Sequence, residues 1–420
     1  MIQRAHRFFE RLGPGLITGA ADDDPSGIAT YSQAGAQFGL GMLWSVLLTT
    51  PLMIGIQVVS ARIGRVTGHG IARNIRDHYS RPLLVFIVSV LLVANTLNIA
   101  ADLGAMGEAL QLVVGGPSHG YALMFGVLVV LMQLFIPYRR LAPLLKWLTL
   151  FLFAYVAVLF TVRIPWGQLI AATIVPPVKL TREYLMLLVG VLGTTISPYL
   201  FFWQASQEVE EQRMVAGEMP LREATDGARR HLRRITFDTW LGMAFSNAIA
   251  FAIMLTTAVT LHDAGITNIE TSAQAAQALR PLAGDLAFTL FAAGIIGTGL
   301  LAVPVLAGSG AYAVAEAMEW PIGHGLQPME AKGFYGIIIL ATLLGVGIDF
   351  TSVDPIKALI WSAVLNGIVA VPIMVVMMRM AARPEIMGAF VIKRRLKRLG
   401  WFATALMGIT VVAMVGSFVL

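Results

Sequence analysis

The 420-residue sequence predicts an all-α integral membrane protein, and three observations support this fold class. Hydrophobic residues make up 57% of the chain and charged residues only 13%, with a mean hydropathy of +0.75. Eleven apolar stretches are long enough to cross a bilayer. Two of them are interrupted midway by a proline beside polar residues. This composition is too apolar for a soluble globular protein of this length.

The apolar stretches define the expected membrane helices and their grouping. They cover residues 14–39, 42–61, 83–112, 121–138, 141–162, 184–206, 237–261, 286–317, 333–347, 353–378 and 401–420. No Gly/Ser linker divides the chain, so we expect one transmembrane domain over residues 1–420. The two interrupted stretches each open a block of five helices, at about 14–163 and 184–378, and an extra helix follows at about 401–420. Because each block has an odd number of spans, the second is inverted relative to the first, as in inverted-repeat transporters.

Basic residues are distributed unevenly among the connecting segments. With the N-terminus in the cytoplasm, 25 of the 30 Lys and Arg residues fall on the cytoplasmic side. This skew follows the positive-inside rule and predicts a C-terminus on the opposite side. The basic run 393–398 is then a topology anchor in contact with lipid, and not a nucleic-acid site. Without signal-peptide or organelle-targeting features, the chain is expected in a prokaryotic inner membrane as a multi-pass protein; a monomer would suffice, and the oligomeric state stays open.

The first interruption, Asp22-Asp23-Asp24-Pro25-Ser26-Gly27, places three carboxylates inside an apolar stretch. Each carboxylate costs at least ~2.5 kcal/mol near the bilayer centre on insertion scales, which indicates a functional site. We expect the helix to break at 24–27, where Asp24 would be a cation ligand; a helix-capping role is the alternative. Asp22 and Asp23 either line a vestibule that attracts cations or simply solvate a wide opening.

The second interruption lies at 193–199, midway along the sixth stretch. Ser197-Pro198 offers a hydroxyl and backbone carbonyls freed by the proline, although similar kinks occur in helices without a ligand. Its position, matching the first break in the other block, favours a ligand role for Ser197. Thr194 lies one turn earlier and could add a hydroxyl on the same face. The polar and acidic residues at 204–211 that close this stretch are interpreted as a solvated helix end.

The third stretch carries a polar stripe of Asn95, Asn98 and Asp102, spaced three and four residues apart on one helix face. The stripe is either a packing cluster or part of an ion path, and the cost of a carboxylate in the membrane favours the path for Asp102. Glu108 lies off the stripe and is a weaker candidate. Asn366, in the tenth stretch, is more simply explained by packing.

Cysteine is absent and the seven histidines fall in expected loops or helix ends, so sulfur and imidazole ligands within the membrane are not expected. The remaining carboxylate, hydroxyl and carbonyl oxygens are hard ligands of the kind that bind Mg²⁺, Ca²⁺ or Mn²⁺. The sequence has no nucleophile–base pair and no phosphate-binding loop, so an enzyme is not expected.

The motifs at both breaks resemble those of the NRAMP family of divalent-metal transporters. In that family the first helix has an Asp-Pro-Gly-Asn break followed by Gln-Ala-Gly-Ala. The matching residues here are Gly13-Pro14-Gly15, Asp24 to Ala36, Gln57, Ala61 to Gly64, Val66 to Gly68, Ala101 to Leu103 and Gly193 to Ser206. The resemblance implies the LeuT-type fold, two inverted five-helix repeats that hold an ion between broken helices 1 and 6.

The departures from the family pattern bear on the substrate. Metal-selective members have Met-Pro-His in helix 6, where this chain has Ser197-Pro198-Tyr199. The asparagine of the helix-1 motif is Gly27 here, which removes one ligand and leaves space, so we include Gly27 and Tyr199 among the weaker site candidates. The glutamate that follows the conserved helix-3 aspartate, Asp102, is Ala105, and a second helix-6 histidine is Gln204. The family associates these last positions with proton movement.

This pattern resembles the NRAMP-related magnesium transporters, whose helix 6 carries a Thr/Ser-Pro-Tyr motif. It implies alternating-access transport of largely hydrated Mg²⁺ without proton coupling, with Mn²⁺ as a poorer substrate and no cofactor. One alternative is a proton-coupled Mn²⁺ or Fe²⁺ transporter. Another is an amino-acid or organic-solute symporter on the same scaffold, against which three aspartates beside the break argue, because the half-helix amides would have to face a substrate carboxylate.

Overall fold

The computed structural model describes residues 14–136, 149–215, 217–225, 227–351 and 354–418, and these ranges contain helices and no strand. Within them, nine helical segments are long and apolar enough to cross a membrane. The prediction of an all-helical membrane protein is therefore confirmed. The predicted stretch 141–162 lies partly outside the described residues. Its described part forms the short helices η2 (Thr149–Leu152) and α9 (Phe153–Val158).

The elements of the first half follow the predicted stretches closely. They are α2 (Pro14–Asp22), α3 (Pro25–Phe38), α4 (Leu43–Thr67), α5 (Ile71–His78), α6 (Arg81–Val114) and α7 (Ser118–Phe135). Helix α5 was not predicted, because it is short and amphipathic. It buries Ile71 and Ile75 while its basic residues face outward. A hydropathy pattern tuned to membrane spans does not detect such an element.

The second half contains α11 (Arg182–Thr195), α12 (Pro198–Arg213), α13 (Ala228–Thr257), α16 (Ala287–Met318), α17 (Lys332–Asp349), α18 (Pro355–Ala381) and α20 (Arg394–Gly416). Short helices α10 (Trp166–Ile174), α14 (Ser272–Ala276), α15 (Arg280–Ala283) and α19 (Pro384–Met387) occupy the connections. Helix α20 begins at Arg394, seven residues before the predicted start at 401. The basic run therefore forms the first turns of a helix, since Lys and Arg are good helix formers.

Both predicted breaks are present. Asp23 and Asp24 separate α2 from α3, and Ile196 and Ser197 separate α11 from α12. The first break was predicted at 24–27, but Pro25, Ser26 and Gly27 already belong to α3. Proline is well suited to the first helical position, where its missing N–H has no intrahelical partner to lose. Each break opens one of the two predicted repeats, whose assignment to a single domain stays a prediction.

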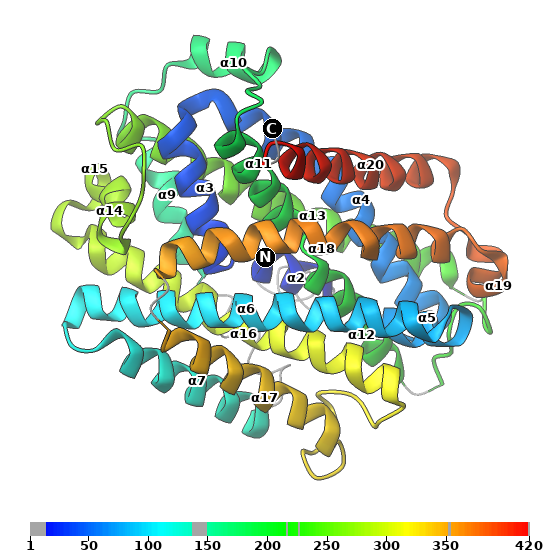
Figure 1. The fold of residues 1–420 in the computed structure, drawn as a ribbon. Coiled ribbons are helices and arrows are strands. Elements are labelled where there is room, and N and C mark those ends of the chain that lie inside the picture. Colours follow the sequence, from blue (N-terminus) through cyan, green and yellow to red (C-terminus); the bar gives the residue numbers. More distant parts are fainter. Residues whose placement is uncertain (1–13, 137–148, 216, 226, 352–353, 419–420) are drawn as a thin grey trace, which may run out of the picture.

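Helix α6 is central to the packing around the breaks. It contacts α16, α17, α18 and α7, and α18 in turn contacts α20, so that α20, α18 and α6 lie side by side across the molecule (Figure 1). Helix α2 packs on α13, and α11 packs on α18. Glycines allow these close approaches: a Cβ on Gly19 would overlap the backbone of Gly242, and one on Gly193 would overlap that of Ala363. The two broken helices are thereby fixed against unbroken ones.

Candidate cation site

Asp24 is the point at which three helices meet. Its Oδ1 accepts hydrogen bonds from the Gly27 amide and the Ser26 hydroxyl, both at 2.7 Å, and it caps α3. Its Oδ2 accepts one from Asn98 Nδ2 of α6 at 3.0 Å and a long one from the Tyr199 hydroxyl of α12 at 3.4 Å. The residue is 2% exposed. The capping role considered as the alternative is present, and the weak Tyr199 contact leaves Oδ2 the more replaceable of the two oxygens.

Asp22 and Asp23 lie beside this point but face another helix. Ser246 of α13 donates its hydroxyl to Asp22 Oδ2 at 2.6 Å and to Asp23 Oδ1 at 3.1 Å. Both aspartates are buried, at 0% and 2% exposure. The prediction that they might solvate a wide opening is therefore wrong for this conformation. Ser246 was not singled out from the sequence, and the only signal was a polar Ser-Asn pair in an apolar stretch.

The predicted stripe on α6 divides between two neighbours. Asn95 turns to α16, donating to Leu306 O at 2.9 Å and Ser309 Oγ at 2.8 Å, so it serves packing. Asn98 and Asp102 face α3 instead. The buried Asp102 carboxylate lies near the Ser26 backbone and the charge of Asp24. Neither of its oxygens accepts a hydrogen bond of good geometry from a described residue.

The second break brings Thr194 and Tyr199 to the same point. A Cβ built on Gly27 would lie 2.9 Å from Thr194 Oγ1 and 3.4 Å from Asp24 Oδ1, so these three residues adjoin. The Tyr199 hydroxyl donates to Ala21 O at 2.9 Å, joining the ends of α12 and α2. Ser197 donates its hydroxyl back to Gly193 O and Thr194 O, at 3.0 and 2.8 Å. Its proton is thus engaged within its own helix, leaving only oxygen lone pairs for a ligand.

Glu108 is not part of this group. It lies six residues beyond Asp102, about 9 Å along the axis of α6. Its Oε2 accepts a hydrogen bond from Ser272 Oγ of α14 at 2.9 Å. Glu108 therefore ties the connection between α13 and α16 to α6.

Two further polar groups near the breaks carry no hydrogen bond of good geometry among the described residues. They are the Tyr31 hydroxyl of α3 and the side-chain amide of Asn366 of α18, both fully buried. Gly367, beside Asn366, packs against Gly193. The packing interpretation of Asn366 explains its burial but leaves its amide without a partner. A single polar residue in an apolar helix was the only sequence signal.

The end of α12 differs from its prediction as a solvated helix end. Glu208 is fully buried and accepts an ion pair from Arg234 of α13 at 2.8 Å. Arg234 also pairs with Glu211 at 2.5 Å. Gln204 donates to Thr239 Oγ1 at 2.8 Å. The acidic residues thus join α12 to α13, because their partners come from a segment distant in sequence.

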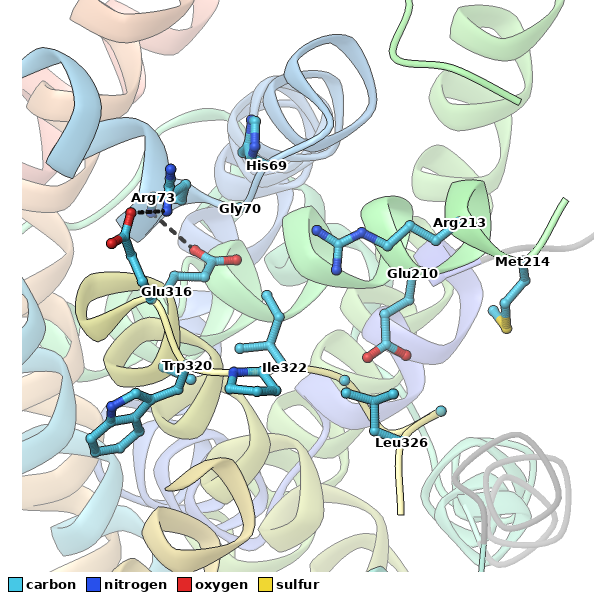
Figure 2. Close-up of a pocket in the computed structure, with 15 residues that line it drawn as sticks. His69, Gly70, Arg73, Glu210, Arg213, Met214, Glu316, Trp320, Ile322 and Leu326 are labelled. Carbon is cyan, nitrogen blue, oxygen red and sulfur yellow. Dashed lines mark hydrogen bonds and ion pairs between the residues drawn. The ribbon is translucent and has the colours of Figure 1, made fainter. Parts of the chain in front are cut away.

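A cavity of about 650 Å³ lies at this end of the molecule and does not include the breaks. Figure 2 shows Glu316 pointing toward Arg73 on one side, with Glu210 and Arg213 across from them. Glu316 Oε2 accepts the Arg73 amide at 3.1 Å. Burial lowers the pKa of His69 in the cavity wall, with the nearby Arg73 charge acting in the same direction. None of the predicted site residues lines this cavity.

Oxygen atoms dominate the region of the breaks. The polar groups that meet there belong to Asp, Asn, Ser, Thr and Tyr side chains. The six histidines within the described ranges lie at helix ends or in connections, as predicted. The arrangement suits a hard cation.

The comparisons with known proteins agree with this architecture. A family model described as natural resistance-associated macrophage protein-like matches residues 15–417. The structure is similar to that of an Eremococcus coleocola manganese transporter in complex with an aromatic bis-isothiourea substituted compound, with a TM-score of 0.76 and 17% identity, covering 98% of this chain and 89% of that one. It is also similar to a closed nucleobase-cation-symport-1 family transporter (TM-score 0.57, 12% identity, 97% and 92% covered) and to MhsT in complex with L-phenylalanine (0.55, 13%, 97% and 98%). These likenesses confirm the predicted LeuT-type fold.

Proposed function

Because the chain belongs to the NRAMP family of divalent-metal transporters, we propose that it carries Mg²⁺ across the membrane by alternating access and without proton coupling. Family membership makes the chain a transporter and not an enzyme, as expected from the sequence. The finer statement, Mg²⁺ as the substrate, rests on the donor atoms around Asp24. We propose Asp24, Thr194, Ser197 and Asp102 as the principal ligands.

The absence of soft donors at the two breaks is the observation that favours Mg²⁺. Ser197 and Tyr199 supply hydroxyl oxygens where metal-selective members have a thioether and an imidazole. Thioether and imidazole ligands favour transition metals, whereas carboxylate and hydroxyl oxygens favour Mg²⁺ and Ca²⁺. A cation entering between Asp24 Oδ2 and Tyr199 would replace only the 3.4 Å hydrogen bond that joins them.

Space beside Asp24 supports a hydrated ion. Mg²⁺ dehydrates reluctantly and usually keeps several waters, bound through one or two carboxylates. Gly27 carries no side chain at the position where the family has asparagine, and it faces Thr194 Oγ1 and Asp24 Oδ1. Substitution there would occupy the space that coordinated water needs.

Burial of the aspartates supports alternating access. Asp22, Asp23 and Asp24 are each at most 2% exposed, so a cation can reach them only after the surrounding helices move. The two breaks lie against unbroken helices that could move with them, as in other inverted-repeat transporters.

The groups at the proton-linked positions support uncoupled transport. Ala105 cannot titrate, and Gln204 donates a neutral hydrogen bond to Thr239. Neither group changes charge near neutral pH, unlike the glutamate and histidine of coupled members. The membrane potential alone can drive entry, since two positive charges are worth about 4.6 kcal/mol per 100 mV.

The orientation and setting are part of the same proposal. We place the N-terminus in the cytoplasm and the C-terminus on the opposite side of a prokaryotic inner membrane, on the distribution of basic residues. A single copy contains both breaks, so a monomer embedded in lipid is sufficient for transport.

Uptake into proteoliposomes, with internal pH recorded, tests the proposal. We expect a negative internal potential to drive Mg²⁺ uptake with no change of internal pH, and Mn²⁺ to compete weakly. Protein-free liposomes are the control for leakage. Mn²⁺ uptake accompanied by internal acidification and unaffected by excess Mg²⁺ would instead support the proton-coupled alternative, which the manganese transporters of similar fold make the main competitor.

Substituting Gly27 with alanine tests the hydrated-ion model. We expect the KM for Mg²⁺ to rise several-fold, because the new methyl group would lie 2.9 Å from Thr194 Oγ1 and occupy space meant for water. Gly336→Ala, on an exposed face of α17 with no atom within 4 Å of the new Cβ, is the matched control. An unchanged KM in the G27A variant would contradict the need for this space.

A further inference from the structure

Asp22 and Asp23 have far fewer stabilising partners than Asp24. The Asp24 carboxylate receives four hydrogen bonds and lies at the N-terminus of α3, where the helix dipole favours a negative charge. Asp22 is the last residue of α2, at the end where the dipole disfavours a carboxylate. The two aspartates share one hydroxyl donor, Ser246, and Asp22 Oδ1 accepts no hydrogen bond from a described residue.

A buried hydroxyl on α3 faces the same two carboxylates. Tyr31 is fully buried, and its oxygen has no hydrogen bond of good geometry within the described ranges. Among charged groups, Asp22 acts on it most strongly, followed by Asp23. Carboxylate and hydroxyl oxygens therefore approach one region from α2, α3 and α13. Backbone carbonyls at the end of α2 add further oxygen, and half-helix C-terminal ends are known cation sites.

The charges in this part of the protein do not balance with one divalent ion. Asp22, Asp23, Asp24 and Asp102 are all buried, and no ion pair among the described residues joins them to Lys or Arg. One Mg²⁺ at Asp24 would compensate two of four negative charges. Uncompensated buried carboxylates are strongly unfavourable.

We propose that Asp22, Asp23, Ser246 and Tyr31 form a second divalent-cation site, which holds Mg²⁺ together with the ion at Asp24. The inference rests on the proposed function, because it takes the Asp24 ion to be the transported one. Two divalent ions match the four carboxylates. Helix α13, through Ser246, becomes a wall of the binding region. Each ion lowers the repulsion met by the other carboxylates, so binding at the two sites is coupled.

Isothermal titration of the full-length protein in detergent with MgCl₂ tests the second site. We expect two Mg²⁺ per chain for the wild type and one for Asp23→Asn. Asp24→Asn should also bind one Mg²⁺, because the second site is intact. Ser246→Ala keeps all four carboxylates and should weaken one of the two binding steps about tenfold. A wild-type stoichiometry of one, or two ions in the D23N variant at wild-type affinity, would overturn the proposal.

Folding and transport are assessed separately. Monodisperse elution and thermal unfolding confirm that each variant is folded, and the S246A variant provides the test if D23N does not fold. Two bound Mg²⁺ without Mg²⁺ uptake would refute the proposed function and leave the second site standing. Uptake by a protein that binds a single Mg²⁺ would do the reverse.

Discussion

Replacing Asp24 with alanine is expected to abolish Mg²⁺ uptake. The substitution removes the carboxylate from the point where α3, α6 and α12 meet and leaves buried donors without an acceptor. Breaking a buried charged pair costs about 3–5 kcal/mol, which corresponds to a loss of roughly 100-fold or more in binding. Uptake of Mg²⁺ by proteoliposomes at a fixed potential measures the effect.

Asp24→Asn separates the ligand role from the capping role. The amide oxygen can still accept from the Gly27 amide, so the cap of α3 is retained while the negative charge is lost. Loss of a cap alone costs about 0.5–2 kcal/mol of stability. We therefore expect thermal unfolding of the D24N variant close to that of the wild type and no uptake. Transport at the wild-type rate would mean that Asp24 serves only as a cap.

The local features of the fold were accessible from the sequence because they depend on neighbouring residues. Pro25 and Pro198 each follow a polar residue in an apolar stretch, and both mark the start of a half-helix in the structure. Apolar length located the membrane helices for the same reason. The amphipathic α5 escaped detection, because its signal is periodicity over two turns and not hydropathy.

Partners across helices could not be predicted from one sequence. Asn95 and Asp102 lie on nearly the same face of α6, but seven residues place them about 10 Å apart along the axis. Asn95 therefore meets α16, whereas Asp102 lies near α3. Ser246 contacts the aspartates only because α13 packs on α2. Such pairings depend on tertiary packing between segments more than 200 residues apart.

That packing is the basis of the second large effect, expected for Gly19→Ala. Gly19 and Gly242 bring α2 and α13 into backbone contact, and a Cβ on Gly19 would overlap Gly242. Backbone atoms cannot rotate away, so the helices must separate, at a cost of about 1–3 kcal/mol for overpacking. The separation would also strain the Gly15 amide bond to Asp238 Oδ2, now 2.7 Å, and the hydrogen bond of Ser246 to Asp22.

We therefore expect the G19A variant to unfold several degrees below the wild type in detergent and to lose most Mg²⁺ uptake. Gly336→Ala is again the control, because its Cβ would meet no atom and alanine favours the helix by about 0.5–1 kcal/mol. A G19A variant with wild-type stability and uptake would show that α2 and α13 need not touch. Reduced uptake with unchanged stability would instead locate the effect in the movement of α2, since only a folded protein that cannot rearrange gives that combination.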